Sequence, residues 1–256
     1  NFNGASVYTF EKDFDNQGAT INAENKEFIV KGDWINNKGT FKSTGQVSLN
    51  GSNQFVDPTA FHRLTIDASE VTLNGNISLA DDFEMSNSST LHANGFSIFS
   101  SGNWYGLNGT FFHENGTVDF SGGAKNIEED DTFYNLHLNI DGTSLISLQG
   151  GVSDYYVMND WIQTGGRVDV NNANLHIGGD FKMGLGDMYE VEKLYLMTQD
   201  NTKNHVFQMG RQFSNSTVAT RNNNTEIIFQ PISGATYIME SDLRMEGSTG
   251  NLILQS

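Results

Sequence analysis

The chain repeats itself with a period of about 70 residues. The segment Lys31–Phe41, KGDWINNKGTF, returns as Ser101–Phe111, SGNWYGLNGTF, with the glycines, the tryptophan and the final Gly-Thr-Phe in the same places. A long internal period is typical of stacked architectures, in which each unit buries its apolar side against its neighbours. The repeat therefore predicts an elongated, repetitive fold.

The repeat can be followed, more weakly, through the rest of the chain. We predict one continuous segment over residues 1–256, with blocks at about 13–81, 82–159 and 160–237 and a partial block at 238–256. The partial block stops before its Gly-x-Trp position, so we expect the chain to be cut from something longer. The segment 184–205 is acidic and poor in glycine, and we expect a possible insertion or a short helical turn there.

Short runs of alternating apolar and polar residues, such as Val47 with Leu49 and Leu136 with Leu138, predict strands of about five residues. Clusters such as NG, GG and DG separate them and predict tight turns. The fold class is therefore all-β. A parallel β-helix, or β-solenoid, built from degenerate repeats of about 70 residues is favoured, because an immunoglobulin-like sandwich needs about 100. Coils of about 20 to 25 residues would give about three coils per repeat.

The composition of the chain argues against some classes of binding partner. The net charge is −17, from 31 acidic and 14 basic residues, which argues against binding to nucleic acid or to anionic lipid. No stretch approaches the roughly 20 apolar residues of a membrane span, so no membrane insertion is expected. The chain has no cysteine, so it has neither disulfides nor a thiol nucleophile.

The aromatic residue that follows Gly-Asp or Gly-Asn is the best recurring candidate for function. Trp34 and Trp104 occupy this position, and Trp161 occupies a related one. A row of exposed aromatic rings could stack on sugars, which makes these three tryptophans candidates for glycan binding. The favoured interpretation is that they fill the interior of the coils, because large aromatic side chains dominate core burial.

Two acidic clusters are candidates for a calcium site. One holds Asp81 and Asp82, and the other holds Asp130 and Asp131 directly after Glu128 and Glu129. Calcium takes several oxygen ligands at relaxed geometry, as such clusters can offer. Neither cluster has the spacing of an EF-hand or of a calcium β-roll, so solvated turns are favoured and no cofactor is required.

Residues suited to catalysis do not cluster in the sequence. The basic residues are scattered, the six histidines lack metal-ligand spacing, and no serine lies in a Gly-x-Ser-x-Gly turn. We therefore expect no enzyme. The alternatives are a carbohydrate-active β-helix, such as a polysaccharide lyase or a glycosidase, and a ligand-free self-assembling fibre.

Two blocks carry a family resemblance: Gly45–Asp67, GQVSLNGSNQFVDPTAFHRLTID, and Gly116–Gly142, GTVDFSGGAKNIEEDDTFYNLHLNIDG. Their Gly-x-Val pattern, followed by Phe-x-Asn-Leu, resembles a repeat of giant cell-surface adhesins of the Bacteroidetes. Arg63 replaces the asparagine in the first block. The resemblance implies export through the type IX system to the cell surface and a role in attachment or gliding motility. The exposed terminal edges of a stacked β-solenoid predict end-to-end self-association, so the expected partners are neighbouring repeats or copies of the same protein, with surface glycans as a further candidate.

Overall fold

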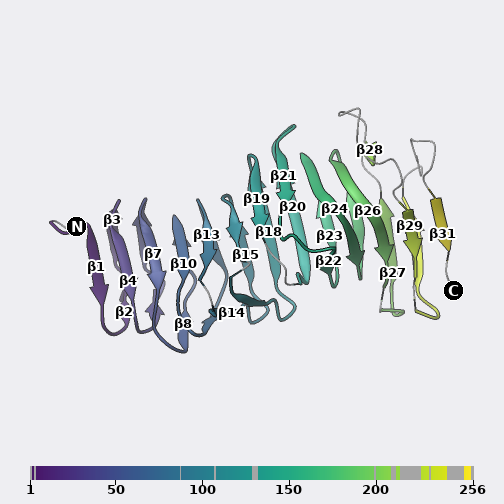
Figure 1. The fold of residues 1–256 in the computed structure, drawn as a ribbon. Coiled ribbons are helices and arrows are strands. Elements are labelled where there is room, and N and C mark those ends of the chain that lie inside the picture. Colours follow the sequence, from purple (N-terminus) through teal and green to yellow (C-terminus); the bar gives the residue numbers. More distant parts are fainter. Residues whose placement is uncertain are drawn as a thin grey trace. The chain divides into compact units, whose positions relative to one another are not determined.

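The computed structural model describes residue 2 and residues 4–86, 88–106, 108–128, 132–198, 200–208, 212–213, 226–230, 232–240 and 251–254. Every regular element in these residues is a β-strand, and the paired strands run parallel, so the predicted β-solenoid is confirmed (Figure 1). The chain forms two compact units, residues 1–119 and 120–256, which are described separately below.

In the first unit each coil contributes one strand to each of three faces. The first face runs in the order β1 (Val7–Phe10), β4 (Glu27–Val30), β7 (Gln46–Leu49), β10 (Arg63–Ile66), β13 (Phe83–Met85) and β16 (Trp104–Tyr105). The second face holds β2 (Phe14–Asp15), β5 (Trp34–Ile35), β8 (Gln54–Val56), β11 (Val71–Leu73), β14 (Thr90–His92) and β17 (Thr110–Phe112). The third face holds β3 (Thr20–Glu24) paired with β6 (Thr40–Ser43), and then β9 (Ala60–Phe61), β12 (Ile77–Leu79) and β15 (Ser97–Ser100).

The coils of the first unit are shorter than the sequence predicts. Successive partners on the first face lie 17 to 21 residues apart in the chain. A shift of 70 residues therefore does not return to the same face. Trp34 lies on the second face, opposite Phe14, whereas Trp104 lies on the first face, opposite Phe83. The 70-residue repeat therefore spans more than about three coils, the number that coils of about 20 to 25 residues would give, and it is a repeat of strands and of the turns that join them.

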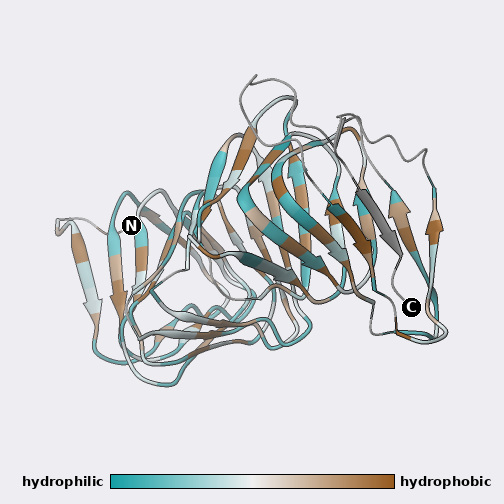
Figure 2. Ribbon diagram, turned by 45° about the vertical axis from the view of Figure 1, so that its right-hand side comes forward, coloured by the Kyte–Doolittle hydropathy of each residue, from teal (hydrophilic) through white to brown (hydrophobic). Residues whose placement is uncertain are grey.

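Alternation of side chains explains why these short segments form strands. In β11, β12 and β13 the two outer residues are buried and the middle one is more exposed, which is the period of a strand with one face on the core. Figure 2 shows the same alternation of hydrophobic and hydrophilic residues along the strands. The interior of each unit is therefore a narrow column of apolar side chains, including Phe28 and Phe83 in the first unit and Phe181 in the second.

The second unit has fewer, longer strands. Strand β18 (Thr117–Gly122) contains the boundary between the units. One sheet runs in the order β19 (Lys125–Glu128), β21 (Leu145–Leu148), β24 (Arg167–Ile177), β26 (Asp187–Leu196), β29 (Glu226–Phe229) and β31 (Asn251–Leu254). Beside this order, β22 (Asp154–Val157) pairs with β24, and β28 (Gln212–Phe213) pairs with β26. The other sheet holds β20 (Asn135–Ile140), β23 (Trp161–Gln163), β25 (Phe181–Met183), β27 (Asn204–Gln208) and β30 (Thr236–Met239).

Strand β24 fuses two faces of the preceding coil into one bent strand. Its first residues pair with β21 and its last residues pair with β22. Between them Asn171 and Asn172 adopt positive φ angles of 56° and 61°, and the register with β26 shifts there. Asparagine tolerates this left-handed conformation better than most residues, which allows a bulge at the bend.

The segment 184–205 belongs to the solenoid rather than to an insertion. It contains β26, which pairs with β24 along both halves of that strand, and it ends in the first residues of β27. The described residues of this segment form no helical turn. The acidic residues that suggested a break alternate with inward-facing Met188, Val191 and Leu194. The segment therefore keeps the alternation of a strand, with acidic residues between the buried apolar ones.

Candidate functional site

The three tryptophans proposed as alternative sugar-stacking residues lie inside the coils. Trp34, Trp104 and Trp161 are each 0% exposed, so none of them presents a ring face to a ligand. Trp34 packs on Phe14 with ring centroids 4.1 Å apart, and its indole N–H donates to Thr59 Oγ1 over 2.9 Å. The role in glycan stacking is therefore wrong for these residues, and the favoured interior role agrees with their burial.

The polar residue before each tryptophan, and before the phenylalanines at the matching positions, forms a hydrogen bond between coils. Asp13 Oδ1 accepts the backbone N–H of Asp33 over 2.9 Å, and Asp33 Oδ1 accepts the N–H of Phe55 over 2.9 Å. Asp82 does the same for Asn103 over 3.0 Å. In the second unit Asp160 Oδ1 accepts the backbone N–H of Asp180, and Asp180 Oδ1 accepts the backbone N–H of Val206. We call these carboxylates, Asp13, Asp33, Asp82, Asp160 and Asp180, the corner ladder.

The glycine of the motif gives the corner ladder its space. A Cβ atom on Gly32 would overlap Asp13 Oδ1 and the Asp13 backbone nitrogen, and one on Gly102 would overlap the backbone of Asp81. A Cβ atom on Gly179 would likewise overlap Asp160 Oδ1 and Asn159 Oδ1. The recurring Gly-Asp/Asn-aromatic sequence therefore shapes the corner between two strands. Its glycine allows the previous coil to approach closely, its polar residue takes part in the hydrogen bonds at the corner, and its aromatic residue fills the core.

The acidic calcium candidates have other partners. Asp81 Oδ2 accepts a bond of 2.6 Å from Arg63, and Asp82 Oδ1 accepts from both the backbone and the side-chain nitrogen of Asn103. In the part of the chain that the structure describes, no three acidic, histidine or cysteine side chains gather as a metal site. The arrangement around Asp81 and Asp82 thus favours a solvated corner, while Asp130 and Asp131 lie outside the described residues.

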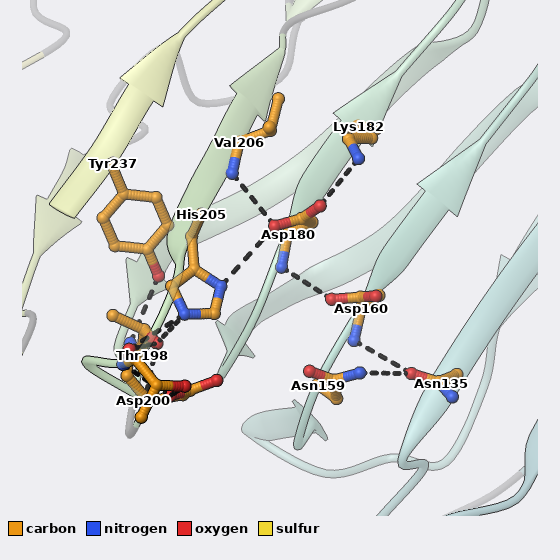
Figure 3. A network of polar contacts seen from close by, with 11 residues as sticks. Asn135, Asn159, Asp160, Asp180, Lys182, Thr198, Asp200, His205, Val206 and Tyr237 are labelled. Carbon is orange, nitrogen blue, oxygen red and sulfur yellow. Dashed lines mark hydrogen bonds and ion pairs between the residues drawn. The ribbon is translucent and has the colours of Figure 1, made fainter. Parts of the chain in front are cut away.

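A polar cluster of the second unit surrounds His205, at the start of β27 (Figure 3). His205 Nε2 lies 2.6 Å from Thr198 Oγ1, and its Nδ1 lies 3.5 Å from Asp180 Oδ1. Asp180 also accepts a bond of 2.6 Å from Lys182 Nζ. Burial raises the pKa of Asp180, but the bonds from Lys182 and from the Val206 N–H outweigh burial and leave the pKa below its usual value.

The order of hydroxyl, imidazole and carboxylate is the one used by nucleophilic hydrolases. Its surroundings differ from those of a catalytic site, because Thr198 and His205 are both 0% exposed. The Thr198 hydroxyl also donates to the Asp200 carbonyl and accepts the Asp200 N–H, both over 3.2 Å. The Thr198 N–H donates to Tyr237 Oη over 3.2 Å. A substrate cannot reach these groups, so the cluster holds the turn between β26 and β27 against the core.

An aromatic stack lies on the outer side of the second unit. Tyr156, His176 and Tyr195 occupy matching positions on β22, β24 and β26. Their ring centroids are 4.4 Å apart at both contacts, with interplanar angles of 16° and 1°. Both faces of the central His176 ring are covered by its neighbours, so the stack joins three coils, while Tyr156 at one end of the stack is 40% exposed.

Asp154 fixes the histidine of this stack. Its Oδ1 lies 2.7 Å from His176 Nε2 and accepts from Asn174 Nδ2 over 2.9 Å, while Ser153 donates to Oδ2 over 2.7 Å. The bonds from His176, Ser153 and Asn174 lower the pKa of Asp154 to about 2. A carboxylate with a lowered pKa stabilises the fold above its unfolded pKa, and this contribution disappears as the pH falls through the folded pKa.

The Asp154→Asn variant should therefore lose stability in a pH-dependent way. Above about pH 4 the variant should unfold at lower urea concentration than the parent, and the difference should shrink as the pH falls toward 2. Urea unfolding between pH 2 and pH 6 measures this difference. Asp67→Asn is the matched control, because it removes an exposed carboxylate without touching the stack. A difference that stays constant over the range would contradict the role of Asp154.

The comparisons with known proteins add no assignment. No protein-family model, no curated protein and no solved structure matches the chain. Among the described residues no helix is long and apolar enough to cross a membrane.

Proposed function

We propose that the chain is a structural and adhesive segment of a long extracellular surface protein or filament, which extends from the cell and serves attachment or surface motility. One observation carries the proposal. The residues that recur along the sequence hold each coil against the next, through the corner ladder and the buried aromatics. A fold stabilised between neighbouring coils can grow in length without a larger core.

Three further observations support this proposal. The polar clusters around Asp82, His205 and His176 are engaged in contacts between coils, which is what a mechanical segment requires. The repeats at residues 45–67 and 116–142 resemble those of giant type IX-exported adhesins, which supports a place at the cell surface. The net charge of −17 favours solubility and disfavours collapse onto other acidic surfaces. The proposal assigns the chain no reaction.

Electron microscopy of the full-length native protein, on its cells and released from them, tests the proposal. Long thin threads are expected, with this segment inside them when a gold-labelled antibody against residues 1–256 is applied. Compact particles, or label confined to the cell interior, would overturn it.

A further inference from the structure

The third face of the first unit is interrupted between two neighbouring strands. Strand β6 pairs with β3, and β9 pairs with β12, but in the described part of the chain no ladder joins β6 to β9. Cα atoms of the two strands nevertheless lie within 8 Å. Strand β9 has only two residues, and Pro58, which lacks an N–H, lies just before it. Two adjoining grooves, of about 360 and 350 Å³, open over this interruption and share Phe41 and Ala60.

The larger groove has a row of short side chains beside an aromatic ring. Ala60, Ser78 and Phe99 are neighbours in register across β9, β12 and β15. Phe99 is 44% exposed and lines the groove. Because Ala60 and Ser78 are short, the surface beside the Phe99 ring is hollow. The ring is therefore available to a ligand in a way that the buried tryptophans are not.

Three polar side chains of the larger groove differ from those of the corners, whereas Asn36 and Thr59, which also line it, are bonded internally. Asn76 uses Oδ1 to accept the Ser97 N–H over 2.9 Å, and its Nδ2 makes no hydrogen bond to the described residues. The hydroxyls of Thr40 and Ser78 likewise make none within the described part of the chain. Elsewhere the corner carboxylates and the Thr198 hydroxyl are engaged internally. These groups lie at the surface beside an aromatic ring, where they can donate to and accept from a small polar ligand.

We propose that this groove binds a neutral oligosaccharide. The apolar face of a sugar ring can pack on Phe99, while its hydroxyls bond to Thr40, Asn76 and Ser78. No side chain that lines the larger groove carries a formal charge, which disfavours a phosphate or a polyanion. An added peptide strand is also disfavoured, because it needs about 9.6 Å between its two neighbours, twice the strand spacing. The inference goes beyond the proposed surface role and does not depend on it.

Binding of the purified chain to an array of neutral and acidic oligosaccharides tests the proposal, followed by calorimetry with the neutral oligosaccharide that binds best. Phe99→Ala should weaken that binding about tenfold, as expected for one lost aromatic contact. Ser78→Leu fills the hollow and should weaken it at least as much, and Thr40→Val removes one hydroxyl with little change of shape. Phe55→Ala is the control, because Phe55 is 48% exposed but lies on the second face.

Three results would overturn the proposal: no neutral oligosaccharide binds, only acidic ones bind, or the Phe99→Ala, Ser78→Leu and Thr40→Val variants all bind as the parent does. If Phe99→Ala fails to fold, the two other groove variants decide. If microscopy shows long threads but no neutral oligosaccharide binds on the array, the proposed sugar site is rejected and the proposed surface role stands.

Discussion

Replacing Trp104 with alanine is expected to lower the free energy of unfolding by about 4 kcal/mol. The side chain is 0% exposed, and its ring lies 4.2 Å from that of Phe83 and 5.4 Å from that of Phe111, measured between centroids. Because the core is one narrow column, no second layer of side chains is available to fill the cavity. Urea unfolding followed by circular dichroism measures the loss.

Phe55→Ala is the control for this experiment. Phe55 is 48% exposed, so its removal should cost less than about 1 kcal/mol. Similar losses for both variants would show that Trp104 does not fill the interior of a coil.

Gly32→Ala should destabilise the chain by about 3 kcal/mol, although it adds a single methyl group. The new Cβ would overlap both the carboxylate and the backbone nitrogen of Asp13 in the previous coil. Backbone atoms cannot rotate away, so the two coils must separate at this corner. The corner ladder bond between Asp13 and Asp33 should be lost at the same time. The drop in urea midpoint measures the effect.

Gly123→Ala is the matched glycine control. A Cβ at Gly123 would meet nothing within 4 Å, and its φ lies outside the left-handed region. Its stability should change by less than about 0.5 kcal/mol, or rise slightly because the unfolded chain loses freedom. If Gly32→Ala were as harmless as Gly123→Ala, the close approach of coils at the corner would be refuted.

The fold class could be predicted because alternation and turn residues are local properties. Val47 with Leu49 and Leu136 with Leu138 lie in strands with these residues buried, as their spacing predicts. The coil length could not be predicted in the same way. A shift of 70 residues shows which modules are alike, but the number of strands per coil is set by how the corners bend the chain. Trp34 and Trp104 therefore occupy like positions on different faces.

The candidate sites depend on contacts that the sequence does not place side by side. Thr198, His205 and Asp180 meet only because two coils stack, and no spacing in the chain marks them. The groove beside Phe99 exists because no ladder joins β6 to β9 in the described part of the chain. Whether two strands pair depends on both of them and on their neighbours, so the sequence of one strand does not reveal it. The sequence does contain a signal for the corner ladder, since Asp or Asn precedes each recurring aromatic residue. The aromatic residue was the candidate for ligand binding, whereas the polar residue before it takes part in the bonds between coils.

Amide hydrogen exchange at single residues tests most directly whether the recurring motif joins coil to coil. In Asp13→Ala the Asp33 amide loses its 2.9 Å acceptor and should exchange about tenfold faster, with the Asn103 amide unchanged. In Asp82→Ala the Asn103 amide should accelerate and the Asp33 amide should not. Each variant is thus the control for the other. Unchanged rates at both amides, or equal acceleration of both in either variant, would contradict the corner ladder.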